Sequence, residues 1–169
     1  MADTGCKVRS ATIEDLAAVA EIYRPYVEST AISFEQEAPT SQQWRARFDN
    51  VVNAGLPFLV AEADGVVLGY AYCSPWRTRP AYRRSVESTI YLSGAARGRG
   101  LGGQLYTDLL EACREWGAHR VIGVVADSGD PSSLRLHTRL GFREVGRLTE
   151  VGHKFGRTWD TVLFEHRLG

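Results

Sequence analysis

The segment from Arg97 to Gly103 constrains the fold of this chain more than any other stretch of its sequence. An extended-type run at 86–92 precedes it, and apolar residues at helical spacing follow it. The first turn of a helix has backbone N–H groups without intrahelical partners, and the helix dipole favours negative charge there. Glycines allow a close backbone approach to an anion, and Arg97 and Arg99 add positive charge. This strand, turn and helix therefore predict a site for a diphosphate.

The same glycines also fit the G-x-G-x-x-G pattern of dinucleotide-binding proteins, and Asp127 follows the next predicted strand as that pattern requires. Two features argue against this alternative. The glycines should follow the strand directly, but residues 93–97 intervene, and the upstream sequence is typical of a hairpin. A Walker-type loop is excluded because no Gly-Lys-Ser/Thr closes the run. A turn that only caps a helix is the simplest alternative, and the two flanking arginines favour the anion site over it.

The run RGRGLG at 97–102 resembles the acyl-coenzyme A motif of the GNAT N-acetyltransferases, (Gln/Arg)-x-x-Gly-x-(Gly/Ala). The resemblance implies that the diphosphate belongs to acetyl-CoA, used as a co-substrate, and that strand backbone before the turn holds its pantetheine arm. The coenzyme-binding residues that we expect on this basis are Ile90, Tyr91, Leu92, Arg97, Gly98, Arg99, Gly100, Leu101, Gly102, Gly103, Asp130 and Ser133.

Composition is that of an ordinary globular protein. With 169 residues, 44% hydrophobic and 24% charged, the chain is expected to form one acetyltransferase domain over 1–169. A net charge of zero predicts neither a nucleic-acid partner nor a membrane surface. Its three cysteines are not spaced as metal ligands, so we expect no metal and a reducing compartment. We see no secretory leader and no bilayer-spanning apolar run, and expect the cytoplasm.

The order of predicted elements indicates a mixed α/β sheet, mostly antiparallel and of GNAT type, with helices on both faces. Pro25 is expected to kink the first helix or to divide it in two. The predicted elements are a strand at 7–10, a helix from Thr12, a helix after Thr40 or Ser41, a hairpin of 58–63 and 66–73, strands at 86–92 and 121–126, a helix ending at Gly117, a short helix from Asp130 to Gly141, and closing strands at 142–151 and 158–168.

Acetyl transfer to an amine needs a base, because an alkylammonium has a pKa of roughly 10. Glu87 is our candidate, since it shares one face of the 86–92 strand with Thr89 and Tyr91, and partial burial would raise its pKa. A strand-end carboxylate paired with a nearby arginine is the alternative. For the acid we choose His137, which stands where the GNAT pattern usually has a tyrosine, four residues before Gly141. A solvent-facing helix histidine is the alternative for that residue.

Several segments together resemble the phosphinothricin and methionine sulfoximine acetyltransferases, over essentially the whole chain. They are WRTRPAY at 76–82, VESTIYL at 86–92, LYTDLL at 105–110, RLH at 135–137 with LGF at 140–142, and GHKFGRTWD at 152–160. The resemblance implies that Glu87 and His137 are the catalytic pair and that the enzyme is a homodimer. The implied site takes a small amino acid with a second anionic group, since arginine forks suit carboxylate and phosphinate oxygens. Its implied substrate residues are Phe34, Arg77, Arg79 and Tyr82, with Glu87.

Two positions depart from that pattern. Glu35 stands where relatives can carry a basic residue. Asp130 replaces the usual asparagine, and because a carboxylate bonds less well to a pantetheine carbonyl, we assign Asp130 mainly to helix capping. We therefore expect a cytoplasmic N-acetyltransferase that transfers acetyl from acetyl-CoA directly to a small amino-acid analogue. An N-acetyltransferase for an aminoglycoside, a polyamine or a protein N-terminus is one alternative. A non-catalytic acyl-CoA-binding module is another.

Overall fold

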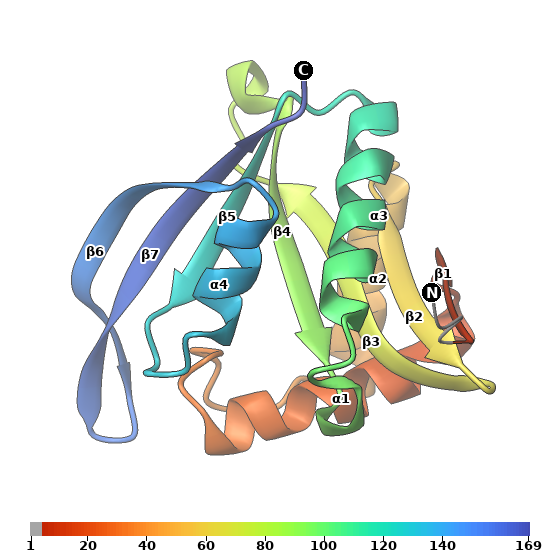
Figure 1. Ribbon diagram of the computed structural model, residues 1–169, viewed down its shortest axis with the longest axis horizontal. Helices are drawn as coiled ribbons and strands as arrows, with labels where there is room; N and C mark the ends of the chain where they lie inside the picture. Colours follow the sequence, from red (N-terminus) through yellow and green to blue (C-terminus); the bar gives the residue numbers. More distant parts are fainter. Residues whose placement is uncertain (1–4) are drawn as a thin grey trace.

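A computed structural model describes residues 5–169, and its centre is a seven-stranded sheet (Figure 1). The strands are ordered β1-β2-β3-β4-β5-β7-β6, and every neighbouring pair is antiparallel except β4 with β5. Their bounds are β1 Cys6–Ser10, β2 Phe58–Ala63, β3 Val66–Pro75, β4 Ser85–Leu92, β5 Arg120–Ala126, β6 Arg143–Lys154 and β7 Arg157–Arg167. The predicted mixed and mostly antiparallel sheet is confirmed.

Helices cover both faces of the sheet, as predicted. In Figure 1, α3 and α4 lie in front of the strands, α2 lies behind them and α1 crosses beneath. The helices are α1 Leu16–Ser29, α2 Ser41–Asn53, α3 Leu101–Trp116 and α4 Ser132–Arg139, with short 3₁₀ turns at Ile13–Asp15, Pro80–Tyr82 and Gly94–Ala96.

Local sequence explains where these helices begin and end. Thr12 and Asp15 form a capping box before α1, and Thr40 forms another with Gln43 at the start of α2. Gly117 ends α3 in the left-handed region, with φ of 99°. The alternative that Pro25 divides the first helix is wrong, because α1 continues through it.

The parallel pair β4 and β5 separates halfway along its length. Ser85 to Ser88 pair with Arg120 to Gly123, and beyond these residues each strand pairs only with its antiparallel neighbour on the other side. Figure 1 shows the two strands moving apart beneath α4. This split opens the sheet between the carboxyl ends of β4 and β5.

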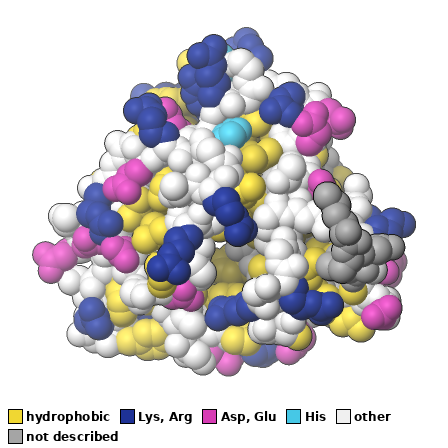
Figure 2. Space-filling model, in the orientation of Figure 1, with side chains coloured by type: hydrophobic (Ala, Val, Ile, Leu, Met, Phe, Trp, Pro, Cys, Tyr) yellow, Lys and Arg dark blue, Asp and Glu magenta, His cyan; other side chains and the backbone are white. Residues whose placement is uncertain are grey.

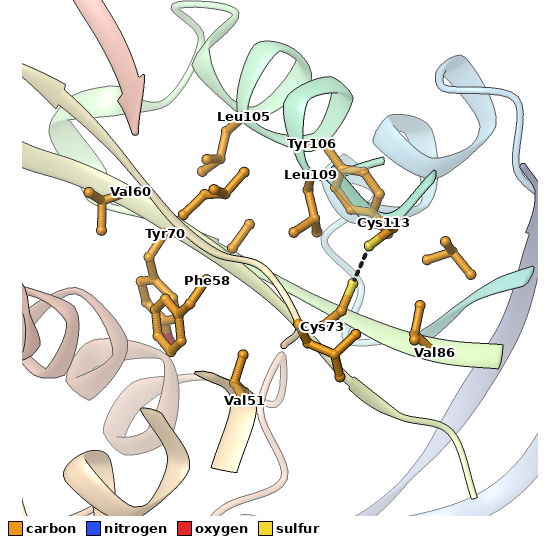
Figure 3. Packing of buried hydrophobic residues seen from close by; sticks show 14 of the residues in the cluster. Val51, Phe58, Val60, Tyr70, Cys73, Val86, Leu105, Tyr106, Leu109 and Cys113 are labelled. Carbon is orange, nitrogen blue, oxygen red and sulfur yellow. Dashed lines mark hydrogen bonds between the residues drawn. The ribbon is translucent and has the colours of Figure 1, made fainter. Parts of the chain in front are cut away.

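The core on the front face lies between α3 and the sheet, where Leu105, Tyr106 and Leu109 are fully buried (Figure 3). Cys73 on β3 and Cys113 on α3 are also fully buried, with their Sγ atoms 3.0 Å apart, as Figure 3 shows. Both are therefore small residues of the core. Along residues 5–169, no helix is both long and apolar enough to cross a membrane.

Candidate active site

The split between β4 and β5 leaves a cavity of about 390 Å³. Its walls come from both strands, from the loop between α1 and α2, from α4 and from β7. The predicted site residues that line it are Phe34, Glu87, Ile90, Tyr91, Asp130, Ser133 and His137. The structure thus places the predicted base, the predicted acid and part of the predicted coenzyme site around one space.

Glu87 lies on β4, opposite Ser74 of β3, at the point where the sheet opens. Burial raises the pKa of its carboxyl group, and the nearby charge of Arg77 lowers it by a smaller amount. Among residues 5–169 no ion pair joins Glu87 to a basic side chain. A half-buried carboxylate that no salt bridge satisfies, facing a cavity, has the properties of a general base.

His137 is buried, with 4% of its surface exposed, so the alternative of a solvent-facing helix histidine is wrong. Its ring stacks on Phe164 at 5.1 Å between centroids, and Gly123 leaves room for it, since a Cβ there would lie 2.7 Å from the imidazole. Nδ1 donates to the carbonyl of Ser133 at 2.8 Å, because a carbonyl oxygen can only accept. Burial lowers the pKa of His137, and the bond to Ser133 opposes this effect.

A short hydrogen-bond chain continues from the other ring nitrogen. Nε2 of His137 lies 3.1 Å from the Tyr106 hydroxyl, which lies 2.5 Å from Oγ of Ser88, and Ser88 can donate to the Ile122 carbonyl at 3.2 Å. In the neutral imidazole, Nε2 accepts from the Tyr106 hydroxyl, which in turn accepts from Ser88, so in this state the Ser88 proton is not given to the Ile122 carbonyl. The sequence reasoning missed Tyr106, although its place one turn after Gly102 on an amphipathic helix indicated an inward direction.

The glycine-rich turn has the predicted backbone geometry. Gly98 and Gly100 adopt φ of 74° and 77°, and Gly100 is the N-cap of α3. A Cβ on Gly102 would lie 3.1 Å from a methyl group of Leu92, so the missing side chain lets α3 approach the end of β4. The N–H groups of residues 101–103 belong to the first turn and have no intrahelical acceptor.

Positive charge surrounds this turn. Figure 2 shows Lys and Arg side chains grouped around a hollow in the lower middle of the molecule, over the starts of α3 and α4. Arg97 donates to the Tyr26 hydroxyl at 3.2 Å, while Arg99 is exposed. The guanidinium group of Arg139 also lies close to the turn, since a Cβ on Gly103 would be 3.3 Å from its Nη2. The sequence reasoning missed this residue. The turn therefore offers an anion both free amide groups and nearby guanidinium groups.

Asp130 has a capping role. Its Oδ1 accepts hydrogen bonds from N and Oγ of Ser132 at 2.9 and 2.6 Å, which also lowers the pKa of the carboxyl group. The N-cap of α4 is Pro131 and the helix starts at Ser132, so the expected start with Asp130 as the cap is one residue too early. Ser133 faces the cavity, as does Ser128, whose buried Oγ has no hydrogen-bond partner in residues 5–169.

These features fit coenzyme A. The turn supplies donors and positive charge for a diphosphate, and the cavity runs along β4 toward Glu87. Ser128 offers a buried polar atom that a bound amide would satisfy.

The predicted substrate residues are only partly assembled. Phe34 lines the cavity, but Arg77, Arg79 and Tyr82 lie on the exposed connection between β3 and β4, outside the lining. Arg77 lies over the ring of Trp76, 4.8 Å from its centroid, and its charge still reaches Glu87.

Glu35 also lines the cavity, and it pairs with Arg47 at 2.7 Å. Among residues 5–169, the side chains that line the cavity include carboxylates but no arginine or lysine.

A mixed sheet split between two parallel strands, with a glycine-rich turn and free amide groups at the end of one of them, fits the fold of an acyl-coenzyme A transferase. Residues 16–142 match the model of the acetyltransferase (GNAT) family. The chain belongs to the GNAT family and is an N-acetyltransferase that uses acetyl-CoA.

Individual relatives extend over nearly the whole chain. A phosphinothricin N-acetyltransferase of Alcaligenes faecalis is 42% identical, covering 99% of this chain and 85% of its own length. An L-methionine sulfoximine/L-methionine sulfone acetyltransferase of Pseudomonas aeruginosa is 36% identical, covering 95% and 94%. Among solved structures, a phosphinothricin acetyltransferase of Sinorhizobium meliloti in complex with AcCoA superposes with a TM-score of 0.93 at 38% identity, covering 98% of this chain and 90% of that one.

Proposed function

We propose that this enzyme acetylates the amino group of a small amino-acid analogue of the phosphinothricin or methionine sulfoximine type. The observation that carries the proposal is the half-buried carboxylate of Glu87, which faces the cavity between β4 and β5 without an ion pair in residues 5–169. The relatives named for these two substrates support the substrate class. Arg77, whose charge reaches Glu87, is the residue we assign to an anionic group of the substrate.

Acetyl-CoA supplies the thioester whose acetyl group becomes the amide of the product. Amide groups at the start of α3, with Arg97 and Arg99 beside them, hold the diphosphate, and backbone from Ile90 to Leu92 orients the pantetheine arm. Glu87, directly or through water, accepts the proton that the amine loses as its nitrogen forms the new C–N bond. Direct transfer is favoured over a cysteine relay, since Cys73 and Cys113 are fully buried and neither lines the cavity.

His137 assists proton transfer in this scheme. The C–S bond breaks as the amide forms, and the departing sulfur needs a proton. His137 lines the cavity and is hydrogen-bonded through Tyr106 to Ser88, which also lines it. We assign this chain to proton supply at the sulfur, directly or through water, once His137 has taken up a second proton: Nε2–H then donates to Tyr106, Tyr106 donates to Ser88, and the Ser88 proton passes to the sulfur.

The test of Glu87 separates binding from chemistry. We expect Glu87→Gln to bind acetyl-CoA as the wild type does by calorimetry, while turnover measured by thiol release falls by at least about 100-fold. Glu144→Gln, which removes an exposed carboxylate on β6, controls for the change in net charge. Wild-type turnover in Glu87→Gln would show that Glu87 is not the general base.

A second candidate is an N-acetyltransferase for a more cationic amine. It is favoured by one observation, that Glu35, Glu87 and Asp130 line the cavity while Arg77 and Arg79 do not. Thiol release with phosphinothricin, methionine sulfoximine, methionine sulfone, a polyamine and an aminoglycoside decides between the two. The first proposal requires kcat/KM to be highest for one of the three amino-acid analogues. Thiol release with none of the five amines would refute both candidates.

A further inference from the structure

Two residues of the 152–160 segment are buried on a strand that is otherwise largely exposed. Most side chains of β6 face solvent, yet Gly152 and Lys154 near its end are buried. Neither lines the cavity, and neither takes part in the scheme above. Both contact the loop that joins α1 to α2, which contributes Phe34 to the cavity wall.

Lys154 holds that loop through its ammonium group, and only 4% of the surface of this residue is exposed. Its Nζ donates to the carbonyls of Val27, Thr30 and Ser33 at 2.6, 2.8 and 2.7 Å, so all three of its protons are used. Val27 and Thr30 lie at the carboxyl end of α1, where the helix dipole favours a cation. The ammonium therefore joins the end of a helix, the following loop and β6 at one point.

Gly152 determines how closely Phe34 approaches β6. A Cβ at residue 152 would overlap the ring of Phe34, with Cδ2 only 2.8 Å away and two other ring carbons closer. The φ of Gly152 lies outside the left-handed region, so an alanine there is opposed by this overlap and not by backbone strain. The ring of Phe34 thus lies directly against the strand backbone on one side and lines the cavity on the other.

We propose that Gly152 and Lys154 are positioning residues that fix Phe34 from β6 and thereby set the size of amine side chain that the cavity accepts. The claim about the amine rests on the proposed function of this site. A side chain at residue 152 pushes Phe34 toward the cavity and so leaves less room for the side chain of the amine. Loss of the ammonium releases the three carbonyls that hold the loop in place.

Steady-state kinetics test the effect on the substrate. We expect Gly152→Ala to raise the KM for methionine sulfone about tenfold and to raise it less for smaller amino acids, with kcat and the KM for acetyl-CoA within about twofold of wild type. Gly146→Ala is the matched control, because residue 146 is on the same strand and its Cβ would make only an ordinary 4.0 Å contact. Equal effects of the two alanines, or a loss confined to kcat, would overturn the proposal.

A thermal double-mutant cycle tests the same contact without any turnover. We expect Gly152→Ala to lower the melting temperature by about 5 °C in the wild type and by less than about 1 °C in a Phe34→Ala background, where the overlapping ring is absent. Additive shifts would show that residue 152 does not position Phe34.

Hydrogen exchange tests Lys154. We expect Lys154→Met to speed amide exchange across residues 30–35 at least about tenfold relative to amides of β2, because three carbonyls lose their donor. Unchanged exchange in a folded Lys154→Met protein would remove that residue from the proposal. Should it not fold, the Gly152 cycle decides the matter alone.

The two levels of the argument fail separately. A wild-type protein that releases no thiol with any amine refutes the proposed function, and the claim about amine size with it. Coupled melting temperatures would still establish Phe34 as held by β6. Normal turnover together with additive melting-temperature shifts at residues 152 and 34 refutes the present inference and leaves the proposed function standing.

Discussion

The hydroxyl of Tyr106 is a single atom that joins three elements of the site. Tyr106 lies on α3 and none of its surface is exposed. Its hydroxyl connects Ser88 on β4 with His137 on α4. The hydroxyl of Tyr70 is buried to the same extent but has no hydrogen-bond partner in residues 5–169. The two tyrosines therefore form a natural comparison of a satisfied and an unsatisfied buried hydroxyl.

Removing each hydroxyl should have opposite effects on stability. We expect Tyr106→Phe to lower the free energy of unfolding by about 1.5 kcal/mol, because His137 Nε2 and Ser88 both lose their partner. Tyr70→Phe should leave stability unchanged or raise it slightly, since it removes an unpaired polar atom. Urea denaturation measures both. Equal losses in the two variants would show that the hydroxyls are equivalent.

The carboxylate of Glu87 should reduce stability near neutral pH. Burial raises the pKa of its carboxyl group in the folded state, so its contribution is most favourable below the unfolded pKa and is lost as the pH rises through the folded value. We therefore expect Glu87→Gln to melt about 2 °C above wild type at pH 7, with the difference disappearing near pH 4. Scanning calorimetry across this range checks the sign. A lower melting temperature at pH 7 would indicate that the carboxylate stabilises the fold.

At the scale of elements, the turn before α3 has a conformational requirement that can be tested apart from its charge. Gly98 adopts φ of 74° with open space around it, so an alanine there meets backbone strain and no steric overlap. Gly94 is also in open space, but its φ is not positive.

We expect Gly98→Ala to raise the KM for acetyl-CoA about fivefold or more, because the strained turn displaces the amides that we propose to hold the diphosphate. Gly94→Ala should change it by less than about twofold, and neither variant should alter the KM for the amine. Bisubstrate kinetics measure all of these constants. An unchanged KM for acetyl-CoA in Gly98→Ala would separate the turn from coenzyme binding.

The predictability of each element from the sequence depends on how local its determinants are. The strand at 58–63 has the predicted bounds, because an apolar run ends at an Asp-Gly turn whose residues adopt φ of 51° and 75°. The closing strand predicted to end at residue 151 continues to Lys154. Its last residues pair with β7 across a turn at Phe155 and Gly156. Because most of its side chains are exposed, the sequence shows no alternation of apolar and polar residues from which the end of the strand could be predicted.

The same distinction applies to the candidate site. The position of Glu87 at the split follows from one strand and one helix, which adjacent segments encode. The burial of Lys154 does not, because its acceptors are at least 121 residues away in the chain. The place of Arg77 outside the cavity depends likewise on a long connection without local pattern.

At the scale of the whole molecule, β6 forms one of the two edges of the sheet, opposite β1 (Figure 1). Val145, Leu148 and Val151 on this strand are 46%, 47% and 58% exposed, and Phe155 in the following turn is 57% exposed. An edge strand with exposed apolar side chains is a surface that other chains can cover, and symmetric pairing of identical patches is the commonest solution. We therefore propose that the protein forms a homodimer through β6.

Light scattering after size exclusion tests this proposal directly. We expect the wild type to elute with twice the chain mass of 18.7 kDa at micromolar concentration. Arginines at both Leu148 and Val151 should shift it to the monomer with an unchanged far-ultraviolet circular dichroism spectrum, because charge is costly in an apolar interface. Val66→Arg is the control, since that residue is 57% exposed on β3, away from this edge. A monomeric wild type, or a dimer that the double variant leaves intact, would rule out β6 as the dimer interface.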